Sequence, residues 1–311
     1  MLCPVPAFAG VAGSVQLPIA NGEDDAEYDD VVQVNMETGS LCTGTLVAPT
    51  LVLTAAHCFR SAGSEQDAAT VSFGPDAEAP WATIDAAGTY VPEEWVGGAF
   101  LELDTPEDYA VVELAEPAEV PPMRLLGLPL DDDALGRSFL AVGYGRDEDN
   151  ELPPVRQRAE LEIATYSDTH LIGFLTGLDD AQPCPGDSGG PAIVVGDDGV
   201  ARHDGVFVSM NCFNTTAQPG SFSYTRGDVA QEFLGDVAAD RLGEGDLCAI
   251  NERYGDGVCD PSCAEEDEDC VVDDGQGCQA SLSGEGDRLG WAAVLLLAAV
   301  RARRGPRRST R

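Results

Sequence analysis

The apolar residues of this chain come in short runs that turn-forming residues interrupt. Residues 51–53 and 139–142 are two such runs, and 35 glycines and 20 prolines are spread over the 311 residues. Glycine and proline end or break regular elements. Short apolar runs bounded by them are typical of the strands of a β-barrel or a β-sandwich. One stretch instead has helical spacing, residues 228–239, with apolar residues at Val229, Phe233, Leu234 and Val237.

The net charge is −38, from 55 acidic and 17 basic residues, and every basic residue is an arginine. Such a chain repels nucleic acids and anionic lipid surfaces, so we expect no nucleic-acid partner. The charge is first of all a solubility feature. Steering of basic substrates is the weaker alternative.

The ten cysteines form local groups without a zinc-like Cys-x-x-Cys array, which predicts disulfides made in an oxidising compartment. The N-terminus agrees in part, because Ala7, Phe8 and Ala9 fit a signal-peptide cleavage pattern. No basic region precedes them, so we expect the start codon to lie upstream.

We divide the chain into four segments. Residues 1–18 are interpreted as a signal-peptide remnant and a short pro-segment, and residues 19–240 as the main domain. Residues 241–272 form an acidic, cysteine-rich module. Residues 273–311 are a linker, a short apolar segment and an arginine-rich tail.

Ser188 lies in the string Gly-Asp-Ser-Gly-Gly-Pro of residues 186–191. A serine hydroxyl is a poor nucleophile and needs an adjacent base. The flanking glycines let the backbone fold sharply, so that its N–H groups can point at a developing oxyanion. The string therefore indicates nucleophilic catalysis by Ser188.

Three histidines could serve as the base, and His57 is set apart because it follows the apolar run at 51–53. His170 and His203 stand in polar surroundings, and we interpret them as surface residues. Asp108 begins an apolar run and is the candidate for the carboxylate that orients the base. Its competitor Asp104 has no apolar run directly after it.

These strings, in the order His, Asp, Ser, resemble the trypsin and chymotrypsin family of serine proteases over residues 19 to about 240. Residues 143–145 and 205–209 also resemble strand segments of that family. The resemblance implies an all-β fold of two six-stranded antiparallel β-barrels with the active site between them and a C-terminal helix, with the small cysteine-rich module appended here.

The resemblance also implies residue roles. Ser188 is the nucleophile, His57 the general base and acid, and Asp108 the residue that orients His57. The N–H groups of Gly186 and Ser188 form the oxyanion hole. The implied disulfides are Cys42–Cys58 and Cys184–Cys212.

In the family a new N-terminus, made by cleavage, pairs its ammonium with the aspartate before the nucleophile. The matching pair here is Ile19 and Asp187. Residues 17–18, Leu-Pro, are not a basic cleavage site, so we expect a host protease to make the mature N-terminus.

The specificity pocket departs from the family as well. Gln182 stands where trypsin-like members carry an aspartate, and a neutral amide cannot compensate a buried guanidinium. The pocket wall is expected at Ser209, Met210, Asn211 and Gly220. We expect a preference for small or medium neutral side chains, although Asp179 and Asp180 lie close enough in sequence for a shifted loop to supply charge.

The module contains Cys248, Cys259, Cys263 and Cys270, which allow two disulfides in three connectivities. Its carboxylates suit calcium, a hard cation that takes oxygen ligands, and its pattern resembles short Notch-like calcium-binding repeats. An acidic spacer without metal is the equal alternative. The candidate calcium ligands are Asp256, Asp260, Asp267 and Asp269.

The tail combines Cys278, an apolar stretch at 289–300 and a run of arginines. It resembles the MYXO-CTERM sorting tail of myxobacterial surface proteins, which implies processing near Cys278 and display on the outer surface of a bacterium. Twelve apolar residues are fewer than the roughly 20 of a spanning helix. A short membrane anchor that stays uncleaved is the alternative.

These patterns predict a secreted or surface-displayed serine endopeptidase. We expect it to act as a monomer on protein or peptide substrates and to require no cofactor. The alternative is a non-catalytic cell-surface binding protein built on a protease scaffold.

Overall fold

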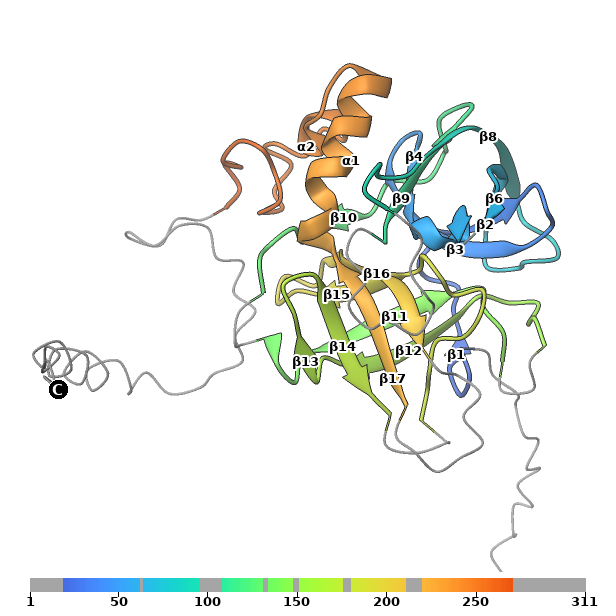
Figure 1. Cartoon of the computed structure of the whole chain (residues 1–311). Helices are drawn as coiled ribbons and strands as arrows, with labels where there is room; N and C mark the ends of the chain where they lie inside the picture. Colours follow the sequence, from blue (N-terminus) through green and yellow to red (C-terminus); the bar gives the residue numbers. More distant parts are fainter. Residues whose placement is uncertain are drawn as a thin grey trace, which may run out of the picture.

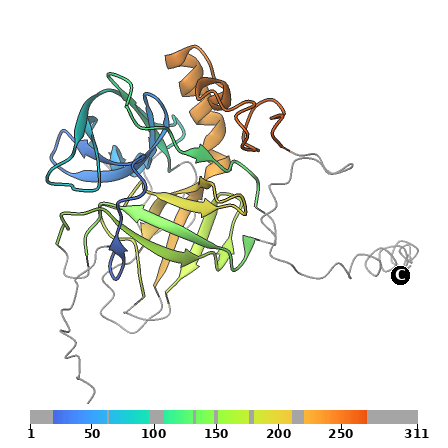
Figure 2. The same cartoon turned by 180° about the vertical axis from the view of Figure 1, so that it is seen from behind.

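The computed structural model describes residues 19–61, 64–95, 108–130, 134–147, 151–175, 180–210 and 220–270. Two β units lie one above the other in Figure 1, and a long helix and the cysteine-rich module lie against one side of them. Figure 2 shows the same arrangement from behind.

The first unit is a closed antiparallel barrel with the strand order β2-β3-β4-β9-β8-β7. Its strands carry the short apolar runs of the sequence; β4, for example, is buried along its whole length. This confirms the predicted six-stranded barrel. The strands are β2 (Val31–Met36), β3 (Leu41–Ala48), β4 (Leu51–Thr54), β7 (Ala68–Phe73), β8 (Ala82–Tyr90) and β9 (Ala110–Leu114).

The second unit is a sheet of nine strands, in the order β1-β12-β11-β15-β16-β17-β14-β13, with β10 added to β16 in parallel. The prediction of a second six-stranded antiparallel barrel is therefore met only in part. Strands β12 and β14, which are far apart in this order, also contact each other, which shows that the sheet curls. The strands are β1 (Glu23–Asp24), β10 (Arg124–Leu125), β11 (Ser138–Gly143), β12 (Gln157–Glu162), β13 (Thr165–Tyr166), β14 (His170–Phe174), β15 (Pro191–Val195), β16 (Ala201–Met210) and β17 (Ser221–Arg226).

The remaining elements are short except for one helix. A 3-10 turn, η1 (Ala56–Cys58), follows β4, and β5 (Arg60–Ser61) pairs with β6 (Ser64–Glu65). Helix α1 (Gly227–Leu242) confirms the predicted helix and extends it at both ends, up to Gly243 in the left-handed region at φ +79°. Helix α2 (Leu247–Ile250) opens the module. None of the helices in the described ranges is long and apolar enough to cross a membrane.

Two histidines correct the sequence-based interpretation. His170 on β14 and His203 on β16 are fully buried, not surface residues. His203 pairs with Ile193 on one side and lies opposite Leu125 of β10 on the other. Burial lowers the pKa of His203 to about 4. The polar neighbours of these histidines in sequence hid the fact that strand pairing covers them.

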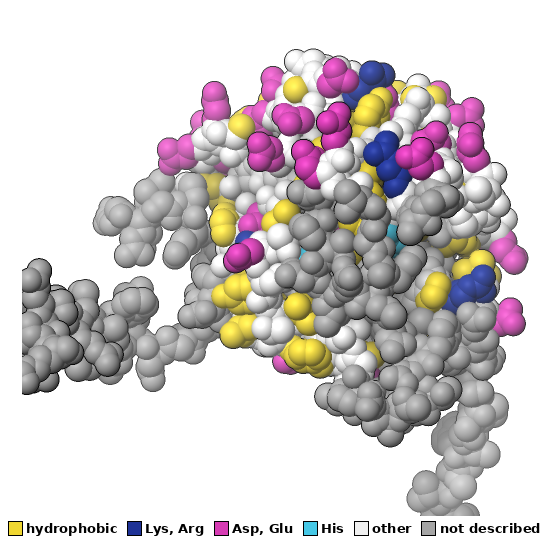
Figure 3. All heavy atoms as spheres, in the orientation of Figure 1, with side chains coloured by type: hydrophobic (Ala, Val, Ile, Leu, Met, Phe, Trp, Pro, Cys, Tyr) yellow, Lys and Arg dark blue, Asp and Glu magenta, His cyan; other side chains and the backbone are white. Residues whose placement is uncertain are grey.

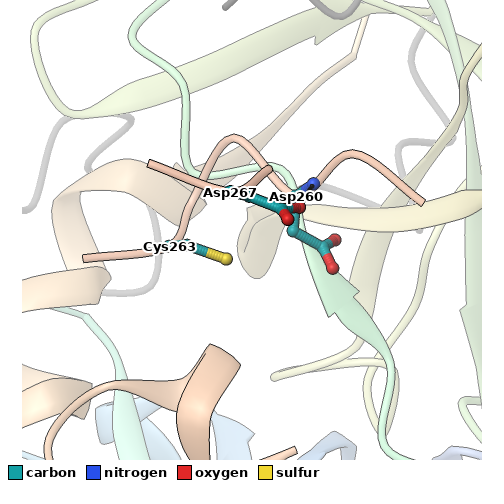
Figure 4. A group of neighbouring side chains, drawn as sticks. All are labelled: Asp260, Cys263 and Asp267. Atoms are coloured by element: carbon teal, nitrogen blue, oxygen red, sulfur yellow. Dashed lines mark hydrogen bonds between the residues drawn. The ribbon is translucent and has the colours of Figure 1, made fainter. Parts of the chain in front are cut away.

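The module is held together by the disulfides Cys248–Cys263 and Cys259–Cys270, which decides among the three connectivities. Figure 4 shows Cys263 beside Asp260 and Asp267. Since the Cys263 sulfur is bonded to Cys248, it has no thiolate to offer a metal.

Two acidic side chains of the module bind the main domain through Arg124 of β10. Its guanidinium forms ion pairs with Asp260 and, at 2.5 Å, with Asp256. Asn251 donates to the Val47 carbonyl at 2.9 Å, and Arg253 to the Met123 carbonyl at 2.9 Å. The module therefore contacts the first barrel and the segment that joins the two units.

Replacing Arg124 by methionine tests this attachment. Asp260 is buried and would lose its ion-pair partner, so we expect the free energy of unfolding to fall by about 3 kcal/mol. Chemical denaturation measures this. We expect calcium chloride and EDTA to leave the wild-type melting temperature unchanged, because the Arg124 guanidinium already binds the carboxylates of Asp256 and Asp260.

The matched control is Arg241→Met. Arg241 is a half-exposed arginine that pairs with Glu113, so its loss should lower the free energy of unfolding much less than the loss of Arg124. Equal effects of the two substitutions, or a rise of several degrees with calcium, would contradict this account of the module.

Candidate active site

Strand pairing in the first barrel brings His57 and Asp108 together. Strands β4 and β9 are antiparallel, with Thr54 opposite Ala110, so the residues after β4 lie beside the residues before β9. The Nδ1 atom of His57 lies 2.8 Å from Asp108 Oδ2, and the backbone N–H of His57 donates to Asp108 Oδ1 at 2.9 Å. Both side chains are buried. The carboxylate therefore holds the imidazole through Nδ1, and an imidazole held in this way can exchange a proton through Nε2.

Ser188 comes from the second unit, in the loop that leads into β15. Its carbonyl accepts a hydrogen bond of 2.8 Å from the N–H of Thr43 on β3. The Cys58 sulfur lies 3.9 Å from the same carbonyl, and Cys58 is the chain neighbour of His57 and is bonded to Cys42 as predicted. The Ser188 backbone is thus adjacent to the segment that carries His57, at the junction of the two units.

Glycine is required at two places in this loop. Gly186 has φ +108°, and a Cβ there would lie 2.8 Å from the Cα of Gly145. Gly189 has φ +85°, and a Cβ there would lie 2.3 Å from the Thr43 carbonyl oxygen. Both positions need the freedom of glycine and its lack of a side chain. The backbone of the loop can therefore lie in direct contact with Gly145 and with β3 of the first barrel.

Asp187 is buried next to Ser188. Its carboxylate accepts 2.7 Å hydrogen bonds from the N–H groups of Gly145 and Cys184. Burial raises the pKa of Asp187 to about 7, although these two N–H groups act in the opposite direction. A buried carboxylate of this kind would be stabilised by a cation.

The segment that begins at Ile19 lies against the second sheet. Ile19 is fully buried, and Ala20 forms a bridge with Gln182, whose N–H donates to the Ala20 carbonyl at 2.9 Å. In this uncleaved chain Ile19 is joined to residue 18 by a peptide bond and carries no ammonium. The Ile19–Asp187 ion pair needs a free ammonium at Ile19, so it stays a prediction.

The predicted pocket residues are described in part. Gln182 and Ser209 are buried, and the Gly220 carbonyl accepts a hydrogen bond from Leu175 N at 2.9 Å. Met210 ends β16 opposite Phe222. Cys184 is buried beside the nucleophile loop. Asn211, Cys212 and Cys278 lie outside the described residues, so the Cys184–Cys212 disulfide stays a prediction.

Sequence reasoning gave no role in the site to Thr43 or to Tyr144, although Tyr144 lies in the string 143–145 that resembles a family strand segment. Thr43 binds the nucleophile loop from the first barrel, and its hydroxyl accepts from the N–H of Tyr144 at 3.0 Å. The sequence offered only a weak signal for Thr43, which is that it follows Cys42, a residue of the predicted disulfide beside His57. A threonine in an apolar strand is ordinarily just a strand residue.

A model of the trypsin family matches residues 19–222. The chain belongs to the trypsin family. Chymotrypsin-like elastase family member 3B of Macaca mulatta is 31% identical over 232 residues, which cover 66% of this chain and 88% of that protein. Kallikrein-4 of Homo sapiens is 28% identical over 210 residues, which cover 60% of this chain and 78% of that protein. Glucanase inhibitor protein 1 of Phytophthora sojae is 28% identical over 188 residues, which cover 53% of this chain and 66% of that protein.

This membership makes the protein a hydrolase of the trypsin-like serine endopeptidase class. The predicted family is confirmed. The fold, a closed barrel joined to a second sheet with few helices and with disulfides, agrees with it.

The raised pKa of Asp187 predicts a pH dependence of stability in the uncleaved chain. The folded state binds this proton more tightly than the unfolded state, whose pKa is near 3.8. Asp187 therefore contributes stability below pH 4 that is lost as the pH rises toward 7, by up to about 4 kcal/mol. In a Ser188→Ala background that prevents self-processing, Asp187→Asn should flatten this decline.

Denaturation at several pH values between 4 and 7 measures the difference between the two proteins. Asp236→Asn on the exposed side of α1 is the control and should leave the profile unchanged. Parallel profiles for the proteins with and without the Asp187→Asn substitution would show that this carboxyl does not titrate in the range.

Proposed function

We propose that the protein is a serine endopeptidase that cleaves peptide bonds through the triad Ser188, His57 and Asp108. The observation that carries this proposal is the pair of hydrogen bonds between His57 and Asp108, at 2.8 and 2.9 Å, beside a loop from the other unit that carries Ser188. A nucleophile, a base and a group that orients the base are the parts that acyl transfer requires.

In this mechanism the Ser188 hydroxyl attacks the carbonyl carbon of the substrate while His57 Nε2 takes its proton. The oxygen of the tetrahedral intermediate becomes negative and is bound by the N–H groups of Gly186 and Ser188. His57 then gives the proton to the leaving amine, and an acyl-enzyme forms. Water, deprotonated by His57, releases the acid product. Every proton-transfer group belongs to the chain, so the reaction needs no cofactor.

We further propose that cleavage before Ile19 activates the protein. The new ammonium would reach Asp187, which is buried and in the uncleaved chain is bound only by N–H groups among the partners described. Ile19 is already buried, and its neighbour Ala20 forms a bridge with Gln182, which supports activation by cleavage at this place. A buried carboxylate with a raised pKa would gain most from such a partner.

The primary specificity is proposed to be for small or medium neutral side chains. Gln182 is buried at the expected pocket base and offers an amide in place of a carboxylate.

A second candidate function is a non-catalytic binding protein on the same scaffold. The observation that favours it is the similarity to a protein named glucanase inhibitor protein. The complete set of Ser188, His57 and Asp108 favours catalysis.

The location is proposed from the ends of the chain. The signal-like N-terminus and the disulfides support secretion, and the tail with Cys278 supports attachment to the outer surface of a bacterium through a MYXO-CTERM-like signal. We propose that the protein acts there as a monomer. The module is proposed to be a metal-free attachment rather than a calcium site, because Arg124 pairs with Asp256 and Asp260.

Ser188→Ala is expected to abolish hydrolysis of a generic peptide substrate, with a loss of at least about 1,000-fold in kcat. The hydroxyl is the atom that attacks, and no neighbour replaces it. A serine-directed fluorophosphonate should label the cleaved wild-type protein rapidly and the variant not at all.

The matched control is Ser138→Ala, which removes an exposed serine of β11 and should change neither turnover nor labelling. Unlabelled wild-type protein with an intact fold and a free N-terminus at Ile19 would favour the binding function instead.

Gln182→Asp tests the specificity. A carboxylate at this place would compensate a substrate guanidinium or ammonium, so we expect kcat/KM for arginine and lysine substrates to rise at least about 10-fold relative to alanine and valine substrates. Cleavage of a peptide library by the wild type and by the variant measures this preference. A wild-type profile dominated by arginine and lysine would overturn the neutral preference.

A further inference from the structure

Thr43 lies in the middle of β3, in the first barrel, and all of its polar atoms bind groups of the site region. Its N–H donates to the Ser188 carbonyl at 2.8 Å, and its carbonyl accepts from the Thr54 hydroxyl at 2.7 Å. Its hydroxyl donates to the Gly186 carbonyl at 2.9 Å and accepts from Tyr144 N at 3.0 Å. The side chain is fully buried.

The hydroxyl fixes one particular peptide group of the nucleophile loop. The peptide between Gly186 and Asp187 has its C=O bound by Thr43 and its N–H bound by the Cys184 carbonyl at 2.9 Å. Because a peptide is planar, two bonds at opposite ends set the direction of the whole group. The peptides directly before and after it carry the N–H groups of Gly186 and Ser188.

The same hydroxyl also ties the loop to a second segment. Tyr144 N is bound by Thr43, and the next N–H, that of Gly145, binds the Asp187 carboxylate at 2.7 Å. One side chain of the first barrel therefore joins Tyr144 to Gly186, and the neighbouring bond joins Gly145 to Asp187. This arrangement exists in the uncleaved chain, without an ammonium at Ile19.

We propose that the Thr43 hydroxyl is a positioning group that holds the Gly186 and Ser188 N–H groups in the direction an oxyanion requires. The inference rests on the proposed function, because it assigns those two N–H groups to the oxyanion hole. Thr43 touches neither the substrate nor the reacting atoms and acts through the backbone of the loop. Preorganised donors stabilise developing charge because they need no rearrangement at the moment of reaction.

The chain offers a matched comparison two residues further along the strand. Thr45 lies on the same face of β3, since side chains alternate along a strand, and it is fully buried. Its hydroxyl has no hydrogen-bond partner within the described part of the chain. Thr45→Val therefore makes the same chemical change without removing an interaction.

The test compares Thr43→Val, Thr43→Ser and Thr45→Val in the cleaved protein. Valine keeps the shape of threonine without the hydroxyl, so we expect Thr43→Val to lower kcat by about 10- to 100-fold with KM within about twofold, somewhat less than the loss of a direct oxyanion donor. Serine restores the hydroxyl, and Thr43→Ser should recover kcat to within about threefold of the wild type. Thr45→Val should leave kcat unchanged.

Hydrogen exchange separates this inference from the proposed function. Thr43→Val should speed amide exchange in residues 186–190, and Thr45→Val should not, whether or not the protein turns over substrate. Absence of turnover in the wild type would refute the proposed function alone. Exchange and kcat that are equal in the two valine variants, or a kcat that serine does not restore, would refute the role of Thr43.

Discussion

The two β units are joined through a buried charged side chain. Arg156 of the second unit is fully buried, and its guanidinium binds the equally buried Asp25 at 2.6 Å. It also donates to the Val31 carbonyl at the start of β2 in the first barrel, at 2.7 Å. Removing one partner of a buried pair typically costs about 3–5 kcal/mol. The segment before β2 is therefore held in one place, and the two units with it.

This interaction supports the site through one aromatic side chain. The Arg156 guanidinium lies 5.7 Å from the ring centre of Tyr144, whose hydroxyl donates to the Gly74 carbonyl of the first barrel at 2.7 Å. The backbone N–H groups of residues 144 and 145 bind Thr43 and Asp187. The buried arginine thus fixes the position of residues 144 and 145, at the end of β11, and these residues in turn bind the groups that hold the nucleophile loop. Most of these contacts are to backbone atoms, so they depend on chain placement more than on residue type.

The sequence was most informative where neighbours in the chain are also neighbours in the fold. The strings around His57, Asp108 and Ser188 and helix α1 are of this kind. The Cys42–Cys58 disulfide came instead from the family resemblance, and the structure confirms it. His170, His203, Thr43 and Asp25 could not be interpreted in the same way. Their partners lie far away in the chain, as His203 lies opposite Leu125, and only the pairing of distant strands decides that they are buried.

Several of the few basic side chains of this acidic protein are buried in the described part of the chain. Arg156, Arg202, Arg226 and Arg253 are all buried. Arginine suits such places, because its planar group has five donors and can bind several acceptors at once. Acidic side chains remain over α1, the module and the first barrel, as Figure 3 shows. Buried arginines are also poor sites for cleavage, so the fold itself protects these positions from proteases that cut after arginine.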